Sequence, residues 1–219
     1  MITFESIKKD ETIRTYVKKA DDSLAALGYT EHSFAHVGKV ADTARYILET
    51  LGADAKAVEL AQIAGYTHDI GNVVNRSEHS QSGAIMMFRL LDHKDMPPED
   101  IATVVSAIGN HDEGTGVPVN AVAAALILAD KSDVRRTRVR NIDPSKFDIH
   151  DRVNYSVEES RLSVDNLQKT VTLNLKIDTE ISSVMDYFEI FLERMILCRK
   201  AADFLGLTFR LVINGQQML

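Results

Sequence analysis

Hydrophobic residues recur at helical spacing from the N-terminus to about residue 140. One stripe runs from Ile7 to Leu27 and ends before Gly28, and a second runs from Val37 to Leu51 and ends before Gly52. Further helices are expected from near Asp54 to His68, from near Ser77 to Leu91, from the pair Pro97-Pro98 onward, and after Asn120. The pattern predicts a mainly α fold in which these helices form a bundle.

The hydrophobic pattern changes after residue 140. The segment TVTLNLKI, residues 170–177, alternates polar and apolar side chains with a period of two, and ESRLSVDN before it can supply an antiparallel partner strand. Residues 181–205 return to helical spacing and stop at Gly206, and TFRLVI is typical of a short closing strand. We therefore expect a helical domain over residues 1–140 and a small C-terminal α+β appendage over residues 141–219, which contains an antiparallel β ribbon and need not fold independently. The ribbon should pack on the bundle or on a second copy of the chain, because an isolated two-stranded hairpin is marginally stable in water.

Composition and charge limit the classes of function. Of the 219 residues 45% are hydrophobic, which is enough for a substantial core in one domain, or in one domain with an appendage. Acidic residues outnumber basic ones by 32 to 25, and the net charge of −7 argues against non-specific binding to nucleic acid.

Targeting signals are absent from the sequence as given. The longest apolar run, residues 121–129, is much shorter than the roughly 20 residues of a membrane-spanning helix. The segment MITFESIKKDET lacks the basic start and apolar core of a signal peptide, and the single cysteine, Cys198, excludes an internal disulfide framework. We expect a cytoplasmic protein without a membrane partner, and the sequence leaves a homo-oligomer open.

Six of the seven histidines fall between residues 32 and 111, and this clustering is the main chemical signal. His32 and His36 are four residues apart at a helix start, so a shared helical face would place them about 5–6 Å apart. His93 stands in a polar loop and is expected to be solvated, whereas His150 is expected to have a core or capping role.

Five segments follow one another in a recognisable order: EHSFAHVGKVA, THDIGN, EHSQSGAIMMFRLL, NHDEGTGVP and LADKSD. Over residues 32–133 they resemble the HD superfamily of metal-dependent phosphohydrolases, and the resemblance implies an HD-type helical bundle. It implies a metal site formed by His36, His68, Asp69 and Asp130. As in the HD-GYP phosphodiesterases and other two-metal members, it also implies that His79 and His111 complete a second site, with Asp69 as the bridging carboxylate.

The residue types agree with this implied site. Imidazoles and carboxylates suit one or two divalent transition metal ions such as Fe, Mn, Co, Ni or Zn, and a bridging carboxylate can hold two cations around a shared water. Thiolate sites are excluded because Cys198 stands alone.

Two segments depart from the HD-GYP pattern. The chain has Asn110-His111 in place of consecutive histidines and Gly116-Val117-Pro118 in place of Gly-Tyr-Pro, so a cyclic dinucleotide is not the expected substrate. The segment HSFAH resembles the class I cyclic nucleotide phosphodiesterases, which makes His32 the candidate general acid.

Charged residues around Asp130 are the candidates for substrate contact. Lys131 or Arg135 could reach a substrate phosphate, because a cation at the mouth of a site offsets the charge of a phosphoryl group. Asp133, one helical turn beyond Asp130, is expected either to orient a ligand or the attacking water, or to cap the following turn.

These observations lead to a functional hypothesis and two alternatives. The sequence favours a metal-dependent phosphohydrolase that cleaves a phosphomonoester or phosphodiester of a small molecule, with a nucleotide as the expected substrate. Metal-bound hydroxide would attack the phosphorus, with His32 and Asp69 as catalytic residues. One alternative is a non-catalytic, metal-stabilised nucleotide-sensing module. The other is a di-iron enzyme that uses oxygen, because a histidine-rich, carboxylate-bridged pair can also hold redox iron.

Overall fold

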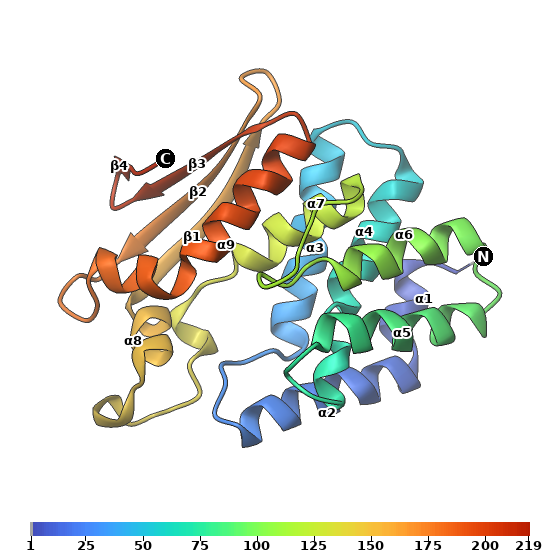
Figure 1. Cartoon of the computed structure of the whole chain (residues 1–219), viewed down its shortest axis with the longest axis horizontal. Helices are drawn as coiled ribbons and strands as arrows, with labels where there is room; N and C mark the ends of the chain where they lie inside the picture. The colour runs from blue at the N-terminus through green and yellow to red at the C-terminus, as the bar shows by residue number, and fades with distance from the viewer. Residues whose placement is uncertain (1) are drawn as a thin grey trace.

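The helices of the N-terminal part begin and end where the sequence supplies capping residues. Asp54 and Asn120 each accept a hydrogen bond from a backbone amide in the first turn of the following helix, and Gly28 and Gly52 take φ of +82° and +76° just after helix ends. The computed structural model describes residues 2–219 (Figure 1) and gives the bundle as α1 (Phe4–Lys9), α2 (Glu11–Ala26), α3 (Phe34–Thr50), α4 (Ala55–Thr67), the 3-10 helix η1 (Ile70–Val73), α5 (His79–Asp92), α6 (Pro98–Gly109) and α7 (Ala121–Lys131). The predicted helical bundle is confirmed.

The first hydrophobic stripe is divided between two helices. The chain breaks at Asp10, whose carboxylate accepts a hydrogen bond from the amide of Ile13 at 2.9 Å and so starts α2 after the short α1. Ile7 and Ile13 are both fully buried, so the hydrophobic face continues across the break.

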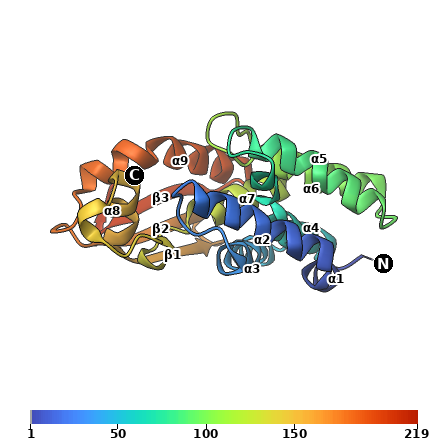
Figure 2. The same cartoon turned by 90° about the horizontal axis from the view of Figure 1, so that it is seen from below.

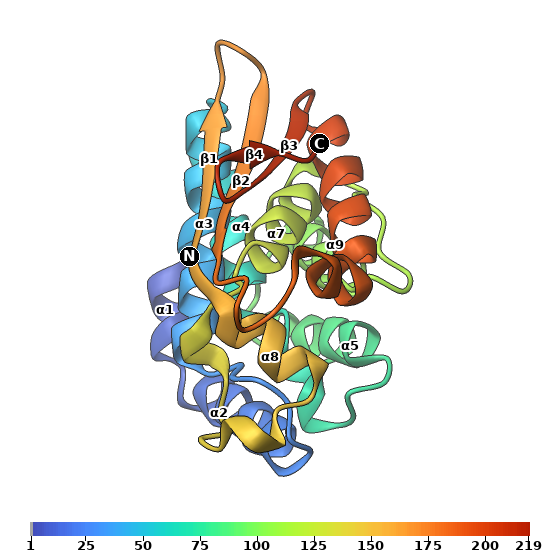
Figure 3. The ribbon, with the colours of Figure 1, turned by 90° about the vertical axis from the view of Figure 1, so that its left-hand side faces the viewer.

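Helix α7 lies at the centre of the molecule. Every residue from Val122 to Ala129 is buried, because α7 packs against α3, α4 and α6 on one side and against α9 (Val184–Phe204) on the other. Figure 3 shows α7 between α3 and α9. A residue at the end of α7 is therefore surrounded by several elements of the fold.

The C-terminal part contains a four-stranded mixed sheet in the order β1-β2-β3-β4. Its strands are β1 (Val157–Asp165), β2 (Thr170–Ile177), β3 (Thr208–Ile213) and β4 (Gln216–Gln217). The predicted antiparallel ribbon is present as β1 and β2, but the ribbon is only half of the sheet, because β3 pairs with β2 in parallel after the crossover helix α9. Figure 2 shows α9 along one face of the sheet, where the apolar side chains of β2 and β3 are buried.

The bundle and the C-terminal part share one hydrophobic core. Helix α9 packs on α7, and β1 lies beside α3, where the hydroxyl of Tyr46 accepts a hydrogen bond from the amide of Val164 at 3.2 Å. The linking segment holds η2 (Arg136–Arg138), η3 (Pro144–Lys146) and α8 (Ile149–Ser156), a short helix that the sequence pattern did not indicate. Among residues 2–219 no helix is both long and apolar enough to cross a membrane.

Candidate metal centre

Helix ends bring the predicted ligands together. His36 lies in the first turn of α3, and His68 and Asp69 lie where α4 gives way to η1. His79 is the first residue of α5, His111 follows α6, and Asp130 lies in the last turn of α7. All six side chains are buried or nearly so, which places a polar cluster inside the bundle.

Gly71 permits the close approach of η1 and α5 that forms the cluster. A Cβ added to Gly71 would overlap the carbonyl oxygen of His79 and would lie 2.5 Å from the amide nitrogen of Gly83. Both obstacles belong to the backbone and cannot rotate away, so only glycine fits beside the His68-Asp69 dyad.

The four buried imidazoles share one orientation. Each ring contacts a fixed oxygen through Nδ1: His36 with Asp133 Oδ2 (2.8 Å), His68 with Gly65 O (2.9 Å), His79 with Arg76 O (3.1 Å) and His111 with Ile108 O (2.6 Å). Because a carbonyl or carboxylate oxygen can only accept a hydrogen bond, Nδ1 carries the proton and is the donor. In their neutral form these rings therefore direct unprotonated Nε2 atoms into the cluster, which is the arrangement of metal-binding histidines.

Two of these nitrogen atoms lack partners. The Nε2 atoms of His36 and His68 are buried and form no hydrogen bond, whereas buried polar atoms in proteins are nearly always satisfied. They lie 3.5 and 3.1 Å from Asp69 Oδ2 and 3.4 and 3.6 Å from Asp130 Oδ1. Two imidazole nitrogens and two carboxylate oxygens around one point form a donor set that fits a divalent cation.

The second carboxylate oxygen of Asp69 faces the other two histidines. Asp69 Oδ1 lies 3.5 Å from His79 Nε2 and accepts a hydrogen bond from Asn72 Nδ2 at 3.0 Å. The Nε2 atoms of His79 and His111 are only 3.2 Å apart, and two lone pairs at that distance need a cation or a proton between them. Asp69 thus has one oxygen on each side, as the predicted bridging carboxylate requires.

The charges in the cluster favour a cation at its centre. Burial opposes charge on His68, yet the carboxylates of Asp69 and Asp130 raise the pKa of the ring to about 10. Burial also opposes ionisation of Asp130, but the charges of Lys131 and His68 hold its pKa well below the ordinary value. The cluster therefore stabilises positive charge, carried by a proton or by a metal ion.

Asp133 fixes the position of His36 from the side away from the cluster. Its carboxylate is 1% exposed and accepts from His36 Nδ1, and it also pairs with Lys39 at 2.8 Å and with Arg135 at 2.9 Å. The structure therefore gives Asp133 a ligand-orienting position, which is the first of the two roles expected from its spacing.

The cluster forms the floor of a cavity of about 380 Å³. Asp69, His79, His111 and Asp130 line it together with His32. Its wall carries four cationic side chains, Arg76, Lys131, Arg138 and Arg194, and three further carboxylates, Asp112, Asp148 and Asp151. The four cations beside the carboxylates and imidazoles of the cluster suit an anionic group that also contacts a metal ion.

The structure places the two predicted substrate contacts differently. Lys131 lines the cavity, where its ammonium lies 2.8 Å from Asp130 Oδ2 and 3.1 Å from Glu113 Oε2. Arg135 is not among the lining residues, and its guanidinium pairs instead with Asp133 and Glu31. Arg76, Arg138 and Arg194 were not predicted, and no motif in the sequence marks them.

His32 lies on the cavity wall just before α3. Its ring donates from Nδ1 to the carbonyl of Thr30 at 2.7 Å, and its centroid is 5.4 Å from that of His36, within the range expected from their spacing. Burial and the nearby charge of Arg138 hold the pKa of His32 well below its ordinary value, so the ring is neutral in the metal-free protein.

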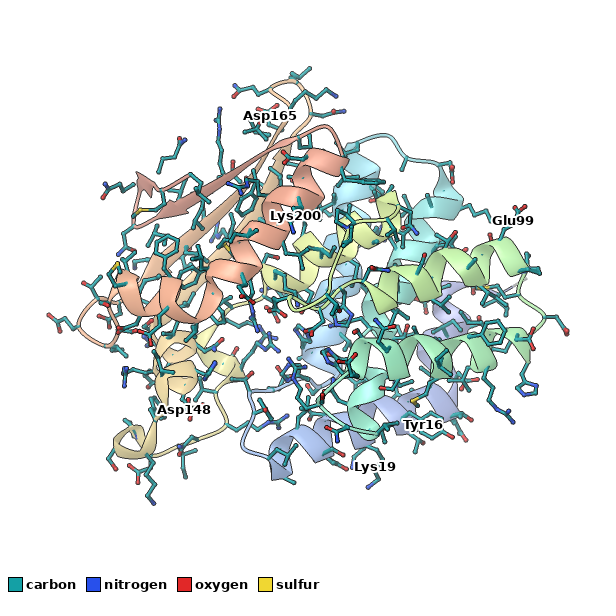
Figure 4. All side chains as sticks on the ribbon, viewed as in Figure 1. Tyr16, Lys19, Glu99, Asp148, Asp165 and Lys200 are labelled. Atoms are coloured by element: carbon teal, nitrogen blue, oxygen red, sulfur yellow. The ribbon has the colours of Figure 1, made fainter. Side chains whose placement is uncertain are left out.

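The C-terminal part also lines the cavity, at its mouth. Asp148 and Asn154 of the α8 region and Phe191 of α9 line it, and Figure 4 shows Asp148 beside α8, at the opposite end of the sheet from Asp165. His150 was expected in a core or capping role, but that expectation is wrong, because its side chain is 61% exposed and lies at this mouth. His93 is exposed, as predicted.

Comparisons with known proteins agree with the geometry. Residues 33–151, more than half of the chain, match the model of the HD domain. The chain is also 25% identical over 179 residues to Uncharacterized protein MJ1020 of Methanocaldococcus jannaschii, an alignment that covers 71% of this chain and 68% of that protein. The matched segment contains all six converging ligand candidates and extends past residue 140 into α8. The chain therefore belongs to the HD domain family, whose members are in general metal-dependent phosphohydrolases.

Proposed function

We propose that the protein hydrolyses a phosphate ester of a small molecule, a nucleotide being the best candidate, and that it needs a divalent metal to do so. The observation that carries the proposal is the convergence of four inward Nε2 atoms and two carboxylates beside a cavity that four cationic side chains line. Membership of the HD domain family supports the same chemistry.

The donor set supports a borderline metal. It contains nitrogen and oxygen atoms and no thiolate, since Cys198 lies buried in α9, outside the cluster. Fe, Mn, Co, Ni and Zn are therefore the candidates, with one ion at His36, His68, Asp69 and Asp130 and a second at His79, His111 and Asp69. A divalent ion in such a site lowers the pKa of water and neutralises charge on phosphoryl oxygens.

The surrounding residues then have distinct parts. Asp69 lies between both histidine pairs, where it orients the attacking water and balances cationic charge. His32 would give a proton to the leaving oxygen. Because its pKa lies well below the ordinary value and its Nδ1 proton is held by Thr30, the ring would first take the proton for the leaving oxygen from solvent. The cationic wall receives the phosphoryl group, and a volume of about 380 Å³ lies within the usual range for small-molecule sites.

An activity screen with controlled metal content tests this proposal. Protein stripped with a chelator and reloaded separately with Mn, Fe, Co, Ni or Zn would be tested against nucleotides and generic phosphomonoesters and phosphodiesters. We expect at least one metal to restore hydrolysis that chelator abolishes again. Hydrolysis that survives complete metal removal, or no hydrolysis with any metal bound, would contradict the proposal.

A further inference from the structure

The four cations on the cavity wall differ in how their charges are balanced. Lys131 lies between Asp130 and Glu113, and Arg194 pairs with Glu113 and stacks on Phe191 with 4.3 Å from its guanidinium carbon to the ring centroid. Arg138 lies 3.9 Å from Asp133 Oδ2, and two backbone carbonyl oxygens accept hydrogen bonds from its guanidinium. Each of these three cations therefore already lies beside at least one carboxylate of the protein.

Arg76 has no such partner. Within residues 2–219 its guanidinium forms no ion pair with a carboxylate, and its contacts are neutral. Nη1 donates to His79 Nε2 at 3.3 Å and reaches Asn72 Oδ1 at 3.5 Å, and the guanidinium carbon lies 5.7 Å from the ring centroid of Tyr29. A guanidinium has five N–H donors, so most of the donor capacity of Arg76 remains available to an anion in the cavity.

The contact between Arg76 and His79 also competes with metal binding. The carbonyl oxygen of Arg76 accepts a hydrogen bond from His79 Nδ1, so His79 Nε2 carries the lone pair of the ring. That lone pair accepts a hydrogen bond from the guanidinium of Arg76. A cation at His79 Nε2 would displace the guanidinium. Arg76 and Tyr29 both line the cavity, so the displaced side chain would still face it.

We propose that Arg76 is the residue of this cavity that binds the phosphoryl group of the substrate, and that its guanidinium leaves His79 for the phosphoryl oxygens when a cation occupies that nitrogen. Two N–H groups of a guanidinium match two oxygens of a phosphate in a bidentate contact. The inference rests on the proposed phosphate-ester hydrolysis and identifies the substrate group that this part of the cavity recognises.

Binding of inorganic phosphate to the metal-loaded protein tests the proposal without turnover. Calorimetric affinities would be compared for the wild type, Arg76→Ala, Arg76→Lys and the control Arg89→Ala, which removes an exposed arginine from α5, away from the cavity. We expect Arg76→Ala to weaken phosphate binding about ten- to hundredfold, because phosphate loses one charged hydrogen-bonding partner. Arg76→Lys should recover part of the affinity, and the control should change it less than about twofold.

Metal content, measured on the same samples, separates the other outcomes. Arg76→Ala should keep its metal ions or bind the ion at His79 more tightly, because the competing guanidinium is gone. Unchanged phosphate affinity in Arg76→Ala, or an equal loss in Arg89→Ala, would overturn the proposal. Loss of metal from both Arg76 variants would overturn it as well and would make Arg76 a positioning residue for His79. Failure of the wild type to hydrolyse any ester would refute the proposed function, whereas phosphate affinity would still decide the role of Arg76.

Discussion

Replacement of Asp133 by asparagine should weaken metal binding although Asp133 itself is not a proposed ligand. The carboxylate accepts a hydrogen bond from His36 Nδ1 at 2.8 Å and also faces Lys39, Arg135 and Arg138. An asparagine has one acceptor oxygen in place of two, so either His36 loses its acceptor or an amide N–H faces the cations. Loss of such an orienting partner typically weakens metal affinity 10–100-fold, which corresponds to about 1.4–2.8 kcal/mol.

The same change should also destabilise the fold. Asp133 is 1% exposed, and removal of one partner of a buried ion pair costs about 3–5 kcal/mol. Two of its cations are partly solvated, with exposed fractions of 40% for Lys39 and 24% for Arg135, so we expect a loss near the lower value, about 3 kcal/mol.

The pH dependence gives this prediction a second readout. Burial opposes ionisation of Asp133, but the hydrogen bond from His36 and the charge of Arg138 hold its pKa well below the ordinary value. Stability from a depressed carboxyl pKa is present above the pKa of the unfolded state, about 3.9, and is lost as pH falls further. The difference between wild type and Asp133→Asn should therefore be full at pH 7 and should shrink below about pH 4.

Metal titration by calorimetry at pH 7, and denaturant unfolding at pH 7 and below about pH 4, would measure these effects. Asp42→Asn is the matched control, because Asp42 is an exposed aspartate of α3. Metal affinity that stays within threefold of wild type in a folded Asp133→Asn protein would refute the claim that Asp133 holds His36 for metal binding.

Three further substitutions test other parts of the site. Gly71→Ala should destabilise the protein strongly and lower its metal content, because the added Cβ would overlap the carbonyl oxygen of His79. The control Gly38→Ala adds a Cβ in open space on α3 and should stabilise the protein by about 0.5–1 kcal/mol, so equal melting temperatures of the two variants would contradict the packing argument. Glu113→Gln should lower the free energy of unfolding by about 3 kcal/mol at pH 7, because Lys131 and Arg194 lose their carboxylate partner. These two cations hold the pKa of Glu113 below its ordinary value against the effect of burial, so the difference in denaturant unfolding should shrink below about pH 4.3. His32→Ala should slow hydrolysis about 10²–10⁴-fold for substrates with poor leaving groups and much less for a nitrophenyl ester, with metal content unchanged; loss of metal would make His32 a ligand instead.

Local sequence signals determined most of the elements. The strand over residues 170–177 and the one over residues 208–213 have the bounds that the alternating pattern indicated, because each strand has one face buried against α9. Asp54 and Asn120 start α4 and α7 as expected, since a capping carboxylate or amide acts within its own turn. The resemblance of the five histidine and aspartate segments to the HD superfamily implied which side chains converge.

Features that depend on distant contacts could not be read in the same way. Arg138 and Arg194 reach the cavity only because η2 and α9 fold back across the end of α7, and neither residue stands in a motif. The same folding places α8 at the cavity mouth, which explains why His150 is exposed there and not buried. The parallel pairing of β3 with β2 depends on the path of α9, which the pattern of hydrophobic residues does not specify.

The most direct test of the central claim is the rate of phosphate-ester hydrolysis as a function of bound metal. Metal-stripped wild type and Asp69→Asn would be titrated with the metal that activates best, and bound metal and the rate on p-nitrophenyl phosphate would be measured in each sample. If the buried cluster is the active centre, the wild-type rate should rise from background in proportion to its occupancy, and Asp69→Asn should bind the metal weakly and stay near background. A wild-type rate that is independent of bound metal, or an equally active Asp69→Asn, would contradict the account.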